Sequence, residues 1–147
     1  MIALDEIIYN ALRADADLMT AVGGRIVSTC FEVSPDEQDN TPLPCIIVMD
    51  DGLQNQPEMK DSMWEATEDT VQASVEIDAP SPREVKQLIR MCRKAIADHI
   101  RQLDDDDEEV PYLQSVQSNG IAWDWMKPCY HSTLTYNCTI DNVYEQD

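Results

Sequence analysis

The chain has 147 residues, of which 43% are hydrophobic, and its formal net charge is −19. This length and apolar content support one domain with a hydrophobic core and exclude an intrinsically disordered chain. No apolar run approaches the roughly 20 residues that cross a bilayer, and so acidic a chain is poorly suited to bind nucleic acid.

The N-terminal residues predict a helix, because apolar residues recur at helical spacing over residues 4–12. A second short helix over residues 15–22 is expected to end at Gly23-Gly24, where glycine tolerates the left-handed conformation. The early acidic residues and the lack of a basic segment are unlike a signal peptide. We therefore expect the mature chain to begin at Met1 and to stay in a cytoplasm.

Three strands are predicted before the long helix. Residues 26–31 form the first, and residues 43–49 form the second, whose almost unbroken apolar run indicates burial on both faces. Asp50-Asp51-Gly52 is expected to end that strand, with residues 52–63 as a loop or as the tip of a long hairpin. From Trp64 the chain is expected to extend again, and apolar and polar residues alternate over 71–78, which predicts a third strand with one wet face.

A helix is predicted from Pro82 to Leu103, with apolar residues at every third or fourth position. Ser81 suits the N-cap, Pro82 the first helical position, and Glu84 completes a capping box. These groups occupy the amides that a phosphate would need, and Ser81 has no nearby base to activate it as a nucleophile. The turn before this helix is therefore expected to reverse the chain and to bind nothing.

This helix also carries most of the positive charge. Six of the ten basic residues lie between Ser81 and Gln102, beside only two acidic ones, so the segment is +4 and the rest of the chain −23. The six are Arg83, Lys86, Arg90, Arg93, Lys94 and Arg101. Such a basic face is either a solvated helix surface or a contact for an acidic neighbour, for example another copy of the chain.

The C-terminal third is predicted to be β. The acidic run 104–109 lacks the spaced ligands of a calcium loop and is expected to be a solvated loop. Strands follow over 112–117 and 121–126, with a turn at 118–120 between them, and Ile121, Trp123 and Trp125 share one face of the second.

The last predicted strand, over 130–140, alternates an apolar face with a Thr-rich face that suits an exposed sheet. The element order indicates an α+β fold in a single domain over 1–147. Its largely antiparallel or mixed sheet would carry two main helices on one face.

No catalytic, metal or cofactor site emerges from the residue pattern, so we expect no enzyme. The five cysteines form no CxxC pair and lie in apolar stretches, which predicts buried reduced thiols; they are Cys30, Cys45, Cys92, Cys129 and Cys138. Cys129 and His131 are the one candidate pair for a thiol–imidazole dyad. Two positions apart on a strand, their Cβ atoms would be about 7 Å apart, too far for a direct hydrogen bond.

Three segments resemble the tail completion or tail terminator proteins of long-tailed phages. They are LRADADLMTAVGGRIV, TPLPCIIVMDDG and TVQASVEIDAPSPREVKQLIRMCRKAI. The resemblance covers residues 4–100, and its marks are a D-L-x-x-x-V-G-G-R-I segment, a Pro-led buried strand, and V-x-I-D-A directly before a capped helix. The residues after 103 match nothing in it.

The resemblance implies a sheet with helices on one side and a structural role in the virion tail. Such proteins form a hexameric ring at the head-proximal end of the tail tube, assembled in the host cytoplasm without a membrane. The ring ends tube growth, contacts the tail tube protein and the head connector protein, and lets DNA pass without binding it specifically. The candidate interface residues are Met59, Met63 and Trp64 in the loop region, and Arg90, Arg93 and Lys94 on the helix.

Other functions remain open at this point. A head-closure or minor tail protein would also belong to the virion. A small acidic protein-binding module, including a DNA mimic, would act as a regulator in a bacterium, and a small hydrolase is the weakest alternative. Oligomeric state separates the ring from the binding module, and binding to the tail tube separates it from a head-closure protein.

Overall fold

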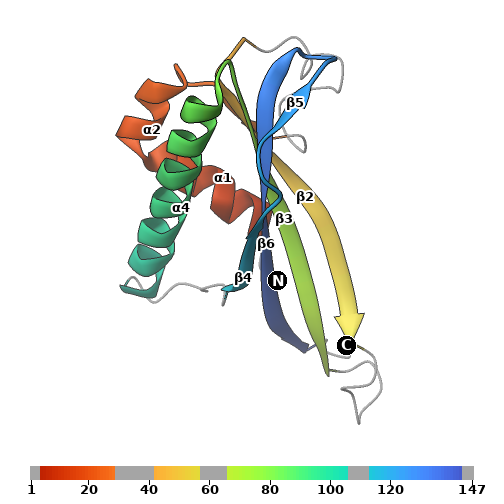
Figure 1. Cartoon of the computed structure of the whole chain (residues 1–147). Helices are drawn as coiled ribbons and strands as arrows, with labels where there is room; N and C mark the ends of the chain where they lie inside the picture. Colours follow the sequence, from red (N-terminus) through yellow and green to blue (C-terminus); the bar gives the residue numbers. More distant parts are fainter. Residues whose placement is uncertain (1–3, 29–41, 57–65, 106–112, 144–147) are drawn as a thin grey trace.

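The order of helices and strands is the one that the hydrophobic pattern predicts (Figure 1). The computed structural model describes residues 4–28, 42–56, 66–105 and 113–143. Its elements are α1 (Leu4–Ala14), α2 (Ala16–Ala21), β1 (Ile26–Ser28), β2 (Cys45–Gln56), β3 (Ala66–Ala79), α4 (Pro82–Asp105), β4 (Leu113–Ser118), β5 (Ala122–Asp124) and β6 (Cys129–Val143).

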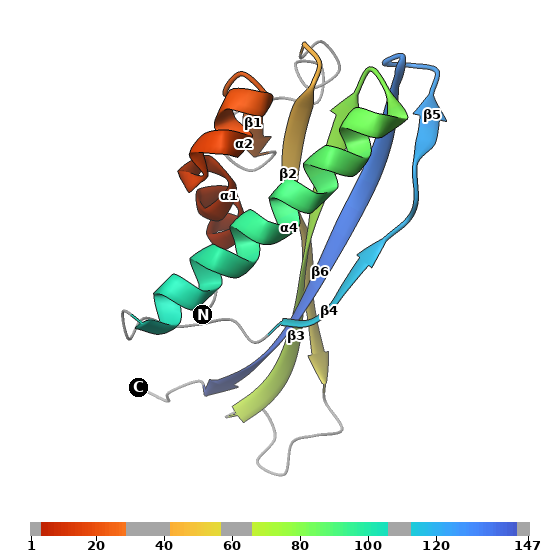
Figure 2. The same cartoon turned by 60° about the vertical axis from the view of Figure 1, so that its left-hand side comes forward.

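The strands form one sheet in the order β1-β2-β3-β6-β4, and β5 also pairs with β6. β1 runs parallel to β2, and the other pairs are antiparallel. The helices all lie on one face of this sheet, with α4 crossing it obliquely (Figure 2). The predicted α+β class is confirmed, with α1 and α4 as the two main helices. A single domain over 1–147 stays a prediction.

The core lies between the helices and the sheet. α1 contributes four buried side chains and α4 five, and they pack against the apolar face of β2, β3 and β6. The predicted alternation of β6 is confirmed, since Leu134, Tyr136 and Cys138 are buried while the residues between them are half-buried. Among the described residues, no helix is both long and apolar enough to span a membrane.

The prediction that β2 ends at Asp50-Asp51-Gly52 is wrong. The strand continues to Gln56, and its register with β3 shifts between Asp50 and Gly52. This bulge takes up one extra residue: Gly52 has a φ of 102°, and its N–H donates to Asp50 Oδ1 at 2.8 Å. Gln56 lies opposite Glu68, so β2 and β3 form a long hairpin. The segment Asp50-Asp51-Gly52 has the composition of a turn, but here it forms a bulge that bends the strand without ending it.

The predicted hairpin between residues 112–117 and 121–126 is also wrong. β4 and β5 do not pair with each other, because both lie along β6, opposite 134–138 and 129–131 respectively. At the break between them, the Asn119 side chain accepts the N–H of Thr133 at 2.9 Å. The side chain replaces a ladder bond, so the chain continues along β6 instead of reversing.

The start of α4 agrees with the prediction. Ser81 Oγ accepts the N–H of Glu84 at 3.3 Å, as an N-cap does. The helix continues to Asp105, so the first two aspartates of the acidic run 104–109 are helical rather than part of a loop. The remainder of that run lies outside the described residues.

Candidate functional site

The outer side of α4 carries a row of basic side chains. Arg83, Arg90, Lys94 and Arg101 are exposed, and their spacing places them on one line opposite the buried side of the helix. We call these four residues the basic stripe, and it runs for about 27 Å at 1.5 Å per residue. The predicted interface residues Arg90, Arg93 and Lys94 are thus accessible on α4.

A groove of about 670 Å³ lies beside the N-terminal half of the basic stripe, at Arg83 and Arg90. Its described lining residues are Arg83, Lys86, Gln87, Arg90 and Met91. Three of these side chains are cationic and one is a thioether, so the groove combines a positive rim with an apolar contact. Such chemistry suits an aromatic or acidic side chain better than a cation.

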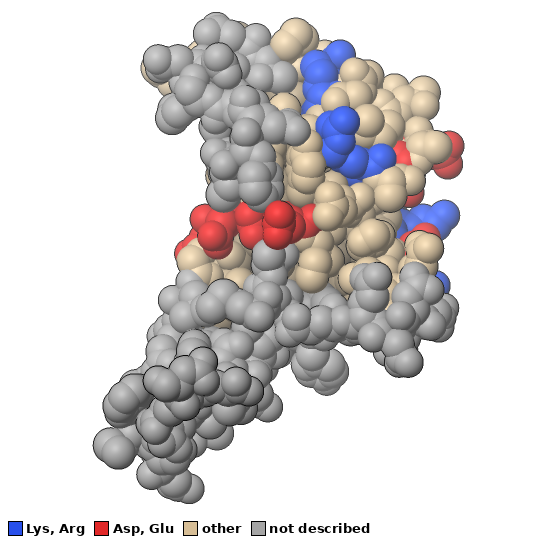
Figure 3. Space-filling model, turned by 180° about the vertical axis from the view of Figure 1, so that it is seen from behind, with Lys and Arg blue, Asp and Glu red and all other residues tan. Residues whose placement is uncertain are grey.

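Charges also separate on the side of the molecule opposite to that of Figure 1. Basic side chains gather over one part of this face, and acidic side chains form a row across another part (Figure 3). Each copy therefore presents surfaces of both signs. The other predicted interface residues, Met59, Met63 and Trp64, lie outside the described residues.

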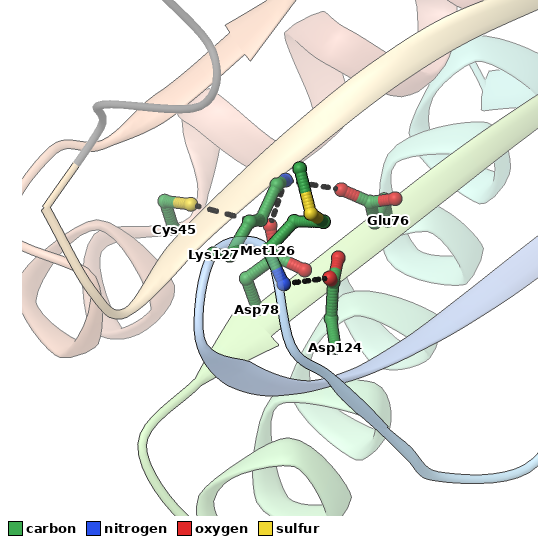
Figure 4. A network of polar contacts seen from close by, with 6 residues as sticks. All are labelled: Cys45, Glu76, Asp78, Asp124, Met126 and Lys127. Atoms are coloured by element: carbon green, nitrogen blue, oxygen red, sulfur yellow. Dashed lines mark hydrogen bonds and ion pairs between the residues drawn. The ribbon is translucent and has the colours of Figure 1, made fainter.

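On the sheet face away from the helices, the turn between β5 and β6 lays Lys127 over β3 (Figure 4). Lys127 Nζ lies 2.7 Å from Asp78 Oδ2 and 2.9 Å from Glu76 Oε2. The Cys45 thiol contacts the same Asp78 oxygen at 3.8 Å. We call these four residues the Lys127 cluster. It joins three separate strands or turns through charged groups that are largely removed from water.

Burial and ion pairing shift the pKa values of this cluster in opposite directions. Burial raises the pKa of Asp78 to about 6, against the opposing effect of the hydrogen bond from Lys127. Burial also lowers the pKa of Lys127, but its hydrogen bonds to Asp78 and Glu76 outweigh this and hold that pKa above its ordinary value. Asp78 Oδ1 is buried and has no hydrogen-bond partner among the described residues. The lysine therefore stays charged and pins the turn to the sheet.

Part of this cluster has donors of the kind that hold a metal ion. Possible ligand atoms of Glu76, Asp78 and His131 all lie within 4.8 Å of one another. The Lys127 ammonium already contacts both carboxylates, in the position that a cation would take. We therefore interpret the group as an internal ion pair.

The thiols have the character of core residues. Cys45, Cys92, Cys129 and Cys138 are buried, reduced thiols, as predicted, and Cys30 lies outside the described residues. Burial raises the pKa of Cys45 and of Cys92 to about 12, and that of Cys129 to about 11. A thiol that stays protonated is a poor nucleophile, which argues against a Cys129–His131 dyad.

Residue-by-residue reasoning missed the turn at 125–128. The strand predicted to reach Met126 ends at Asp124, whose Oδ1 accepts the N–H of Met126 at 2.9 Å and so begins the turn. Trp125 therefore lies in the turn and does not continue the strand face of Trp123. One signal was present in the sequence: Lys127 is the only basic residue after Arg101.

Comparisons with known proteins identify the family. The model of the family "Tail completion protein gp17" matches residues 6–119. A chain in the solved virion of a native gene transfer agent particle is 15% identical, with 95% of this chain and 96% of that chain covered at a TM-score of 0.49. No curated protein matches the chain. Because the family model covers well over half of the sequence, the chain belongs to the tail completion protein gp17 family and is a structural protein of phage tails.

Proposed function

We propose that the protein forms a ring, most simply a hexamer, at the head-proximal end of the tail. The ring ends growth of the tail tube and joins the tail to the head. Beyond family membership, the observation that carries this proposal is the exposed basic stripe on a chain of net charge −19. A subunit with one positive surface and a strongly negative remainder attracts its own copies head to tail, and such contacts close into rings.

The charge also suits a passage for DNA. A ring of these subunits carries several times the net charge of one copy, and a negative lining prevents the counterion release that drives binding to phosphates. DNA would pass through such a ring without being held. The protein partners in this proposal are the tail tube protein on one side and the head connector protein on the other.

Negative-stain electron microscopy of the purified protein, alone and with its tail tube protein, tests the proposal. We expect rings with a central hole, or tubes whose ends are closed by rings. Rings that form only on tube ends would mean templated assembly and would also support it. A protein that stays monomeric and ignores the tube would overturn it in favour of an acidic binding module. Binding to the connector alone would favour a head-closure protein.

A further inference from the structure

The turn between β5 and β6 exposes an unusual amount of apolar surface. Among the described residues, the exposed large hydrophobic side chains are Val116, Trp123, Trp125 and Met126. Three of the four fall within four consecutive positions, and Trp125 and Met126 are 84% and 92% exposed. Clustered exposed aromatic and methionine side chains are typical of protein-binding surfaces.

This turn is held in one conformation at both ends. Lys127 anchors its C-terminal end to Asp78 and Glu76, and Asp124 accepts the N–H of Met126 at its start. The Trp125 ring packs edge-on against Trp123 at 5.8 Å between centroids. An aromatic ring that is already held on a fixed turn loses little conformational entropy on binding, so Trp125 is preorganised for a partner, while the flexible Met126 side chain can adapt to it.

We propose that Trp125 and Met126 of one subunit dock in the α4 groove of a second copy, a contact that rests on the proposed ring. The groove offers Met91 for apolar contact and two guanidinium groups, Arg83 and Arg90, that can lie over the face of an indole.

Charge favours a second copy as the occupant. Around the turn, the half-buried carboxylates of Glu76 and Asp124 outnumber the single ammonium of Lys127, and Asp78 adds a buried third carboxylate. The groove presents three cations, Arg83, Lys86 and Arg90. The two surfaces therefore have opposite signs, and opposed charges speed and orient association.

The placement of the two surfaces favours a head-to-tail contact. β5 lies at one border of the sheet, while α4 crosses the helix-covered face (Figure 2). The groove lies on the exposed side of α4, so turn and groove are separate surfaces of one subunit. A contact between two different surfaces repeats from copy to copy and closes into a ring when the rotation allows.

Photo-crosslinking tests the contact directly. Trp125 is replaced by benzoylphenylalanine, the assembled protein is irradiated, and peptides are mapped by mass spectrometry in a mixture of isotope-labelled and unlabelled subunits. We expect crosslinks from position 125 to residues 83–91 of another copy. Crosslinks confined to the same subunit, to another segment or to the tail tube protein would overturn the proposal.

A double-mutant cycle supplies the energetic test. We expect Trp125→Ala to raise the dissociation constant of self-assembly about 30-fold, as loss of a central aromatic contact does, with the melting temperature unchanged. Arg90→Ala should weaken assembly less, and the double variant should fall short of the product of the two effects. Val116→Ala, at an exposed apolar position on β4, is the matched control and should assemble like the parent.

The results of these experiments distinguish failure of the docking contact from failure of the proposed ring. Normal rings from Trp125→Ala would overturn the docking of the turn and leave the proposed function in place. If the parent chain forms no ring even with tail tubes present, the proposed function fails, and the docking contact fails with it.

Discussion

At the scale of single residues, Lys127 is the least expected feature of the molecule. Its side chain is 13% exposed, and its ammonium lies between two carboxylates, of which Asp78 is 1% exposed at the side chain. Removing one partner of a buried ion pair leaves uncompensated charge, which destabilises more than the intact pair stabilises. Lys127 is therefore the residue on which the placement of the β5–β6 turn depends.

We expect Lys127→Met to lower the free energy of unfolding by about 3–5 kcal/mol near neutral pH. Asp78 has a folded-state pKa of about 6 against an ordinary value of 3.8, so the folded state binds the proton more tightly. Stability gained through this group therefore rises as pH falls from 7 towards 4. Without Lys127 that pKa rises further, so the variant should recover part of its loss at acid pH. Urea unfolding at neutral and acid pH measures both effects.

A control for this variant also removes the two carboxylates that Lys127→Met leaves without a cation. Lys127→Met combined with Glu76→Gln and Asp78→Asn should be more stable near neutral pH than Lys127→Met alone. A single variant that loses less than about 1 kcal/mol at both pH values would contradict the ion-pair interpretation, since loss of a partner from a buried pair is costly.

Two other residues should be dispensable for function. We expect Cys129→Ser and His131→Ala to leave ring assembly and tail joining intact, because a protonated, buried thiol cannot act as a nucleophile. Assembly of each variant is measured by electron microscopy and its fold by circular dichroism. A loss of joining with the fold preserved would show chemistry at this position.

Residue-scale features were predictable where the partners are near in sequence. Ser81 accepts the backbone N–H of Glu84, three positions away, and serine is a residue type that favours the N-cap position. Lys127 finds its partners 49 and 51 positions earlier, and nothing local encodes such a contact. The sequence shows that Lys127 is the only lysine or arginine after Arg101. Which carboxylates it contacts, however, depends on how β5 pairs with β6.

At the scale of elements, α4 combines two functions on one helix. Its apolar side packs on the sheet, and its basic stripe faces outward. Both faces follow from helical periodicity, so the sequence predicted this element well. The β elements were harder, because a bulge at Asp50–Gly52 and the side chain of Asn119 mimic turns, although the chain there continues as a strand.

The basic stripe and the adjacent Arg93, which is also exposed on α4, carry the element-scale prediction. We expect the reversal of Arg90, Arg93 and Lys94 to Glu to weaken self-assembly, because like charges would then meet across the interface. Sedimentation velocity at low salt, where charge effects are largest, measures the change. The same three positions changed to Gln remove the attraction without adding repulsion and should show a smaller loss. Unchanged assembly of the Glu variant at low salt would remove the stripe from the interface.

At the scale of the whole molecule, charge is the dominant property. Fold class and net charge could both be predicted from composition and hydrophobic pattern, because each depends on many residues and is not changed by a wrong prediction for one strand or turn. The surfaces that we propose to join copies could be predicted only in part, because the basic segment is continuous in sequence, whereas the exposed turn depends on contacts between distant segments.

We expect the protein not to bind duplex DNA, even at about 50 mM salt, where phosphate contacts are strongest. Fluorescence anisotropy of a labelled duplex, with and without the assembled ring, measures this. Variants that reverse charge on α4 should behave in the same way. Tight binding that weakens with salt would show that the basic stripe faces DNA and not a neighbouring subunit.

The buried thiols have a consequence for the life of the particle. A tail protein leaves a reducing cell and then meets oxygen, and oxidation of cysteine proceeds through the exposed thiolate. The described cysteines are all buried, and burial raises the pKa values of Cys45, Cys92 and Cys129 to about 11 or 12, so these thiols stay protonated near neutral pH. These sulfurs are shielded from sulfenic acid formation and from crosslinking between particles for as long as the subunit stays folded. The stability of the fold therefore also determines how long these thiols resist oxidation by air.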